Sequence, residues 1–278
     1  MTVIESDTRY PREKPVDETT LSGSEVRQVN PWPPRMPAVS DDSIAQECAI
    51  ALEYNGISVA VMMASPLDLE DFVYGFSFTE GIIEKASEIY DIQIHTHDLG
   101  LRIAIELAAE RFVALKTKRR QMTGRSGCGL CGAESLEQVH LPLAVLQPTI
   151  TVSHDAIQKA LAELEAHQPL QQKTGAVHGA AWCNVSGAIE AVFEDVGRHN
   201  ALDKLIGSRL RLSSNNKDGF VLVSSRASYE MVQKAVRAGI EMMVSVSAAT
   251  TLAVDVAQEA GLTLVGFGRP KRHLVYSH

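Results

Sequence analysis

The strongest constraint on the fold lies in the second half of the chain, where short apolar segments alternate with segments of helical apolar spacing. Strands that alternate with helices of ten to fifteen residues build a layered sheet, and strands joined by such crossovers run mostly parallel. The sequence therefore predicts an α/β layered sheet over residues 151–278. The expected strands cover 174–184, 188–195, 219–224, 242–246 and 262–267, and the expected helices cover 153–167, 198–210, 229–238 and 251–260.

The preceding region, 41–121, predicts a smaller N-terminal α+β domain. The Asn55-Gly56 pair lies between two apolar segments, which is typical of a tight hairpin turn. Ser65 or Asp68 is a candidate cap for the helix that follows, and Ser153 caps the first helix of the second half. The expected elements are strands at 44–54 and 57–63, a helix over 67–83, and two or three more strands within 89–115.

Residues 1–40 differ from the rest, because they hold six of the eleven prolines and few aliphatic residues. Such a segment buries too little apolar surface to offset its ordering entropy, so we expect a mobile N-terminal arm. There is no run of about 18 apolar residues and no apolar secretory leader, and we therefore expect a cytoplasmic protein that does not cross a membrane. The formal charge of −8 argues against nucleic acid as a general partner.

Residues 122–150 are expected to form a flexible loop and linker that carries the motif GCGLCG, with Cys128 and Cys131. Two cysteines at this spacing suit a metal site, a redox dithiol, or a nucleophile with a resolving partner. Five cations lie within 116–125, and one cation about 6 Å from a sulfur favours the thiolate by roughly 0.7–2.8 kcal/mol. Because glycine-rich backbone moves easily, the motif favours a mobile carrier of sulfur over a rigid site.

Zinc is the main alternative for this cysteine pair. A structural zinc site needs four ligands, and Cys183 and His178 could complete one only at a spacing that matches no common zinc motif. We expect no catalytic metal, but a cofactor-binding chaperone with a structural zinc site and a dithiol oxidoreductase both remain open. Zinc deaminase chemistry is excluded, because no histidine or cysteine is followed by Glu two positions later.

Three expected strand ends carry residues suited to binding anions, in the crevice where α/β sheets bind ligands. For the first of them, a solvated turn with Asp195 as a helix cap is an equal alternative. His178 lies in a strand rich in small residues, whose backbone something must approach closely; it is either a ligand contact or, more simply, a satisfied core histidine. The candidate contacts are Gly197 and His199 in the first strand end, Ser224, Arg226 and Ser228 in the second, and Phe267, Gly268, Arg269, Pro270, Lys271 and Arg272 in the third.

Several long segments together resemble the FdhD/NarQ family of formate dehydrogenase accessory sulfurtransferases, over residues 45–278. The segments are TGRSGCGLCG, residues 173–181, EDVGRHNALDKLIG, VLVSSRASYEMVQKA and SAATTLAV. The resemblance implies a cytidine-deaminase-like fold for the C-terminal half and a homodimer. It also implies that 267–272 contacts the molybdenum cofactor in its bis-molybdopterin guanine dinucleotide form.

The resemblance further implies the reaction. A cysteine desulfurase passes persulfide sulfur to Cys128, with Cys131 as its partner, and the sulfur goes to the molybdenum cofactor before that cofactor enters the formate dehydrogenase catalytic subunit. We expect a two-station transfer, in which the cysteine loop carries sulfur and the three strand ends hold the cofactor or its guanine nucleotide. Attack on the carried sulfur, or displacement by Cys131 with disulfide formation, would release it.

Overall fold

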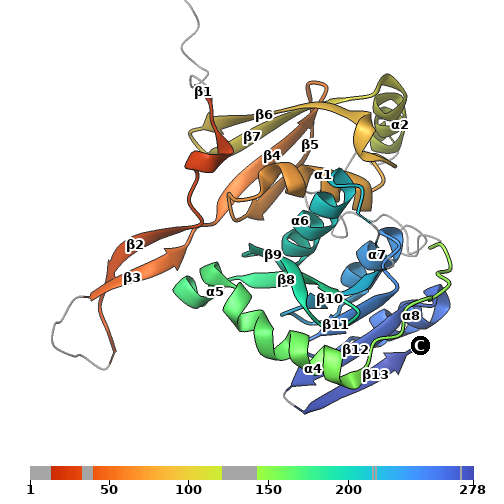
Figure 1. The fold of residues 1–278 in the computed structure, drawn as a ribbon. Helices are drawn as coiled ribbons and strands as arrows, with labels where there is room; N and C mark the ends of the chain where they lie inside the picture. The colour runs from red at the N-terminus through yellow and green to blue at the C-terminus, as the bar shows by residue number, and fades with distance from the viewer. Residues whose placement is uncertain (1–13, 33–39, 121–142, 215, 217, 270) are drawn as a thin grey trace, which may run out of the picture.

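The computed structural model describes residues 14–32, 40–120, 143–214, 216, 218–269 and 271–278. It is a mixed α/β structure with a five-stranded sheet, a six-stranded sheet and a two-stranded ribbon that projects from the body (Figure 1). Cys128, Cys131 and Pro270 lie outside the described residues. Among the described helices, none is both long and apolar enough to cross a membrane.

The C-terminal half forms the six-stranded sheet, in the order β13-β12-β11-β10-β8-β9. Strands β10, β11 and β12 are parallel, as their crossover connections require, whereas β8, β9 and β13 join antiparallel. The layered α/β expectation is confirmed, and β13 is an addition to the expected strands. The bounds are β8 His178–Asn184, β9 Ile189–Asp195, β10 Gly219–Val223, β11 Met242–Ser245, β12 Thr263–Arg269 and β13 Arg272–Ser277.

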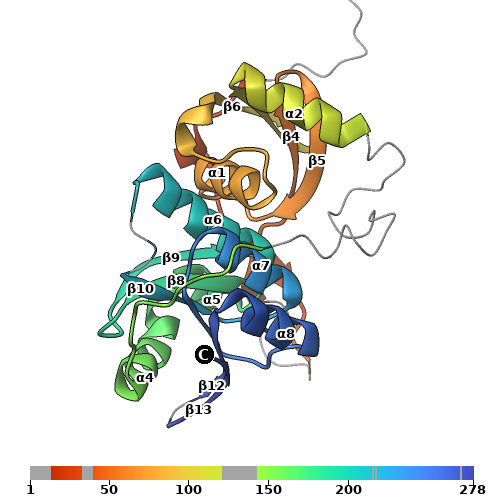
Figure 2. The same cartoon turned by 90° about the vertical axis from the view of Figure 1, so that its right-hand side faces the viewer.

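Helices cover both faces of this sheet (Figure 2). Val221 and Val223 of β10 pack under the helices of one face, while Phe220 and Leu222 pack under α4 on the other, as side-chain alternation along a strand requires. The expected cap of α4 is present, because Ser153 Oγ accepts a hydrogen bond from Ala156 N at 3.1 Å. The bounds are α6 Arg198–Arg211, α7 Tyr229–Arg237 and α8 Thr251–Ala260 on the first face, and α4 His154–Glu163 with the short η3 Leu164–His167 and α5 Pro169–Thr174 on the second side.

The N-terminal half forms the five-stranded sheet, in the order β1-β6-β7-β4-β5, and α1 packs on one of its faces. The Asn55-Gly56 hairpin is confirmed, with both residues at positive φ. The segment 109–120 is a helix, not a further strand, because Phe112 and Leu115 lie three residues apart and reach the same core. The bounds are β1 Lys14–Pro15, β4 Cys48–Tyr54, β5 Ile57–Ala64, β6 Ile89–His97, β7 Gly100–Leu107, α1 Leu69–Thr79, η2 Ala86–Glu88 and α2 Ala109–Arg120.

Residues 14–32 correct the expectation of a wholly mobile arm. β1 pairs with β6, and β2 Ser24–Val29 pairs with β3 Ser40–Ala45 to form the projecting ribbon. Between them, η1 Glu18–Thr20 places the Glu18 carboxylate so that it accepts hydrogen bonds from Leu69 N and Glu70 N. Glu18 therefore caps α1, whereas Asp68 precedes the helix with a positive φ and makes no capping bond. A low-hydrophobicity segment becomes ordered here through backbone pairing and capping, which composition does not reveal.

Residues 143–152 run past the amino ends of β11 and β12 without regular structure. Leu146 N donates to Ala260 O at 2.8 Å, and Thr149 N donates to the buried Glu241 carboxylate at 2.6 Å. Leu146 packs with the core under α7 and α8, whereas Ile150 packs with the core under α4. This end of the expected flexible linker is therefore anchored to the helical layers on both faces of the sheet.

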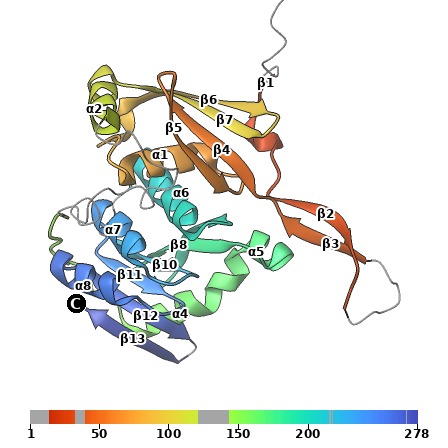
Figure 3. The ribbon, with the colours of Figure 1, turned by 180° about the vertical axis from the view of Figure 1, so that it is seen from behind.

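Helices α1 and α6 join the two halves and cross at very short range (Figure 3). A Cβ atom at Gly75 would lie 1.8 Å from Asp203 O, and one at Gly207 would lie 1.8 Å from Asp71 O. No real Cβ contact is that short, so each helix needs a glycine where the other helix's backbone passes.

Polar groups buried beside this crossing also bridge the two halves. Lys204 Nζ lies 2.7 Å from the Asp195 carboxylate, and both side chains are fully buried. Asp195 accepts from Ser65 N at 3.0 Å, and Asn200 Nδ2 donates to Met63 O at 2.9 Å. The last two contacts join β9 and α6 to the end of β5 and the turn after it, and Lys204 Nζ also donates to Ser65 O in that turn at 3.1 Å.

We predict that Gly75→Ala destabilises the fold by about 1–3 kcal/mol, because the added methyl group forces the α1–α6 crossing apart. Helix propensity alone would favour alanine by roughly 1 kcal/mol, so the sign of the change is diagnostic. Chemical denaturation measures the free energy of unfolding. Ser208→Ala, on the same crossing helix α6, is the control and should change it little; a Gly75→Ala protein as stable as the parent would refute the crossing.

We predict that Lys204→Met lowers the free energy of unfolding by about 3–5 kcal/mol, because it leaves the buried Asp195 carboxylate without its cation. Lys159→Met, which removes an exposed lysine from α4, should stay within about 0.5 kcal/mol of the parent. Equal effects of the two substitutions would show that the buried pair does not hold the two halves together.

Candidate active site

In the segment 194–200, some side chains make buried structural contacts, and others lie at the surface. The Glu194 carboxylate accepts from Leu170 N and Gln171 N, both at 2.8 Å, and so caps α5. Asp195 is fully buried and belongs to the network between the two halves, although its Oδ1 also accepts from Gly197 N at 2.7 Å. The solvated-turn alternative for Asp195 is therefore wrong, because this carboxylate has no exposure to solvent.

The carboxyl ends of the three parallel strands lie side by side. Ser247 N donates to Ser225 O at 3.4 Å, and Phe267 N donates to Ser247 O at 2.9 Å. Ala227 N donates to Ala248 O at 3.1 Å, so the turns after β10 and β11 run together. The structure thus brings the 224–228 turn and Phe267 together at the carboxyl end of the parallel strands.

Ser224 connects this turn to β8. Its Oγ accepts from Gly179 N at 2.9 Å, and its own N donates to Gly179 O at 2.9 Å. A Cβ atom at Gly179 would lie 2.3 Å from the Gln168 side chain. The close approach expected for this small-residue strand is therefore made by Gln168 of the same chain, not by a ligand.

A cluster of cationic and polar side chains lies where α6 and α7 begin. His199 Nε2 lies 2.6 Å from the Glu230 carboxylate, and this contact lowers the pKa of Glu230. Burial lowers the pKa of His178, and the nearby charges of Arg198 and His199 lower it further. We call these four side chains, together with Ser228, the strand-end cluster.

Apart from His199 Nε2, which faces the Glu230 carboxylate, two buried polar atoms of the strand-end cluster lack a hydrogen-bond partner among the described residues. They are Arg198 Nε and Ser228 Oγ. A buried donor without a partner costs about 1–3 kcal/mol, so native proteins rarely leave one unless a water or ligand satisfies it. The cluster sets one carboxylate against a guanidinium and two imidazoles, and its buried, unpartnered Arg198 Nε and Ser228 Oγ suit an anion.

The third candidate segment, 267–272, is split by the fold. Phe267 lies at the strand ends with a φ of 51° and is 39% exposed. Beyond it the β12–β13 hairpin runs over α4, where Lys271 N donates to Gln158 Oε1 at 2.6 Å. A Cβ at Gly268 would lie 2.7 Å from Leu161 of α4, so this glycine serves packing. Arg269, Lys271 and Arg272 are exposed on this hairpin, and Arg226 is exposed on its turn.

The described cysteines are poor nucleophiles. Burial raises the pKa of Cys183 to about 12 and also raises the pKa of the half-buried Cys48. His178 and Cys183 lie five residues apart on β8, so their side chains leave opposite faces of the sheet and do not share a site. Within the described residues, no group of three or more histidine, cysteine and acidic side chains could hold a metal.

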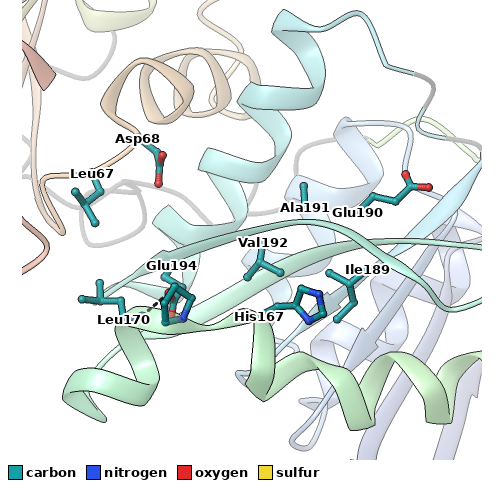
Figure 4. Close-up of a pocket in the computed structure, with 10 residues that line it drawn as sticks. Leu67, Asp68, His167, Leu170, Ile189, Glu190, Ala191, Val192 and Glu194 are labelled. Atoms are coloured by element: carbon teal, nitrogen blue, oxygen red, sulfur yellow. Dashed lines mark hydrogen bonds between the residues drawn. The ribbon is translucent and has the colours of Figure 1, made fainter. Parts of the chain in front are cut away.

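A cavity of about 380 Å³ lies away from the strand-end cluster, along the outer edge of β9 (Figure 4). It contains none of the predicted contact residues. Its walls come from Leu67, Asp68, His167, Pro169, Leu170, Ile189, Glu190, Ala191, Val192 and Glu194.

Sequence reasoning missed Glu230 of the strand-end cluster and gave Arg198 and His178 no definite role. Arg198 lies inside a segment that was singled out for its neighbours, and Glu230 lies in the first turn of the helix after the serine-rich turn. For His178 the sequence favours a core position over a ligand contact, whereas the structure places it half-buried beside Arg198. The sequence signal that could have found them is position: each residue lies at the start of a strand or helix, and these starts lie together at the carboxyl end of the parallel strands.

Comparison with known proteins gives consistent results. The FdhD/NarQ family profile matches residues 45–278. A protein of Cupriavidus necator named sulfur carrier protein FdhD is 50% identical over 240 residues, which cover 86% of this chain and 83% of that protein. A protein of Xanthomonas euvesicatoria pv. vesicatoria with the same name is 46% identical over 264 residues, covering 95% and 94%.

The fold has a solved counterpart in the crystal structure of a Desulfotalea psychrophila protein named as a formate dehydrogenase accessory protein. The two superpose with a TM-score of 0.70 at 28% identity, over 92% of this chain and 98% of the other. With a family profile that spans most of the sequence and relatives near half identity, this chain belongs to the FdhD/NarQ family.

Proposed function

We propose that this protein is a sulfur carrier that serves formate dehydrogenase. In this role it accepts persulfide sulfur from a cysteine desulfurase and transfers it to the molybdenum cofactor, which is the cargo and not a resident group. Two relatives that align over most of this chain are named sulfur carrier proteins. The reaction belongs in the cytoplasm, where reducing conditions keep thiols free.

The observation that carries this proposal is the pair of unpartnered buried donors in the strand-end cluster. Arg198 Nε and Ser228 Oγ are positioned on one sheet edge with His178 and His199. A guanine dinucleotide cofactor presents pyrophosphate oxygens, which accept a charge-assisted hydrogen bond from a guanidinium and further hydrogen bonds from hydroxyl and imidazole N–H groups. Phe267, partly exposed at the same edge, offers a surface against which a flat base can stack.

The sulfur step requires a thiolate, and the described cysteines do not supply one. Burial keeps Cys183 and Cys48 protonated at neutral pH, which leaves Cys128 and Cys131 as the reactive pair. The Cys128 thiolate attacks the terminal sulfur of the donor persulfide, and the donor thiolate leaves, with no net change of oxidation state. If Cys131 then displaces the sulfur, hydrosulfide leaves and a Cys128–Cys131 disulfide forms, which a thiol reductant must reopen.

We predict that Cys128→Ala lowers sulfur labelling at least tenfold when the protein is incubated with a cysteine desulfurase and labelled cysteine, because the accepting thiolate is gone. Peptide mass spectrometry locates the label. Cys131→Ala should keep the label on Cys128, and Cys48→Ala should behave like the parent. Full labelling of the Cys128→Ala protein would overturn the assignment.

We predict that Arg198→Ala weakens binding of guanosine diphosphate about 10–100-fold, since a hydrogen bond to a charged group contributes about 1.5–3 kcal/mol. Calorimetric titration at fixed ionic strength measures the affinity. Lys173→Ala removes an exposed charge from α5 and should have little effect.

Sulfur labelling on Cys128 should be unchanged in the Arg198→Ala protein, because the two stations act separately. Undiminished nucleotide binding after Arg198→Ala would place the cofactor elsewhere on the protein.

A further inference from the structure

The cavity beside β9 combines apolar walls with negatively charged side chains. Its carboxylates belong to Asp68, Glu190 and Glu194, and none of the described residues that line it is an arginine or a lysine. Its one imidazole, that of His167, is engaged elsewhere, with Nδ1 2.9 Å from Glu163 O. We call this cavity the β9 groove. Its apolar walls come from the turn after β5, the start of α5 and β9 itself: Leu67, Pro169, Leu170, Ile189, Ala191 and Val192.

Two of the three carboxylates can bind a partner. Asp68 precedes α1 with a φ of 52° and makes no capping bond, because Glu18 caps that helix instead. Within the described residues, no donor forms a hydrogen bond with the exposed Asp68 carboxylate. Glu190 is also exposed, and one of its oxygens accepts from Asn184 Nδ2 at 3.0 Å. Glu194, by contrast, is buried and committed to the cap of α5.

The two available carboxylates lie at opposite ends of the β9 groove. Figure 4 shows Glu190 at one end, and Asp68 with Glu194 toward the other. Four consecutive residues, 189–192, line the groove. Because side chains alternate between the faces of a sheet, consecutive lining residues place the groove along the edge of the strand. At about 3.3 Å per residue, Glu190 and Glu194 are about 13 Å apart along β9.

The shape of the β9 groove decides what can occupy it. A helix about 13 Å long and about 10 Å across fills about 1,000 Å³, which is more than twice the cavity volume of about 380 Å³. An extended chain is narrower, because neighbouring strands need only about 4.8 Å. It turns every second side chain to the same surface, and its residues i and i+4 are also about 13 Å apart. The groove therefore suits a short extended segment.

We infer that the β9 groove binds an extended segment of a partner protein that carries lysine or arginine at two positions four residues apart, with an apolar residue midway. The two cations pair with Asp68 and Glu190, and their aliphatic stems lie along the apolar walls. Recognition is by side chains, because Lys204 already occupies the Glu194 carbonyl and a bulge interrupts the β8–β9 pairing. The inference does not depend on sulfur chemistry or on the strand-end cluster, so its failure would leave the proposed function intact.

Fluorescently labelled peptides test this inference with the full-length chain. Fluorescence anisotropy should show saturable binding of the peptide AKALAKA, whose lysines are four residues apart with a leucine midway. The peptide AKALKAA, in which the second lysine is moved by one residue, should bind about two- to fivefold more weakly, because it loses one ion pair. The peptide AEALAEA should bind at least tenfold more weakly than AKALAKA, because both of its charges are repelled by the groove.

Substitutions in the groove complete the test. Asp68→Asn and Glu190→Gln should each weaken binding of AKALAKA about two- to fivefold, and the double variant about four- to twenty-fivefold, because charges about 13 Å apart act independently. Glu259→Gln is the matched control, because it removes an exposed carboxylate of α8 outside the groove, and it should bind as the parent does. Circular dichroism shows that each variant is folded. The inference is overturned if the parent does not bind AKALAKA, if AEALAEA binds equally well, or if the folded double variant binds AKALAKA undiminished.

Discussion

The close crossing of α1 and α6 is the contact on which the rest of the structure depends. Gly75 and Gly207 let the backbones of the two helices approach to a distance that no side chain could occupy. The crossing buries Asp195 and Lys204 away from water. The two charges can be buried only because each side chain carries the opposite charge to the other and lies against it. The start of α6 is fixed by these contacts, and with it Arg198 and His199.

This arrangement explains how one short segment supplies both buried structural contacts and part of the strand-end cluster. Glu194, Asp195 and Asn200 point into the protein, where they cap α5 and bridge the two halves. Arg198 and His199 lie on the neighbouring positions and meet Glu230 and His178 at the sheet edge. A rigid buried anchor directly beside a charged surface keeps that surface preorganised for an anionic ligand.

Much of the fold could be predicted from local signals. The Asn55-Gly56 turn, the Ser153 cap and the helix over 251–260 all follow from backbone chemistry or apolar spacing. The ribbon of β2 and β3 could not be predicted, because its strands are polar and gain order only by pairing with each other. The first residues of helix α2 could not be told from a strand, because a short apolar segment fits either period.

The candidate site could be predicted from the sequence only in part, for a related reason. The ends of strands can be located from the sequence, and the 224–228 turn and Phe267 do meet at the carboxyl end of the parallel strands. Which side chain of a charged segment turns inward depends on tertiary packing, so the sequence leaves open whether Asp195 caps a solvated turn and whether His178 contacts a ligand or lies in the core.

The central claim is that the strand-end cluster holds the phosphates of a guanine dinucleotide. A crystal structure of the protein with guanosine diphosphate tests it most directly. The account predicts phosphate oxygens within hydrogen-bond distance of Arg198 Nε and Ser228 Oγ. A nucleotide seated along the outer edge of β9, with both of those atoms still unpartnered, would contradict it.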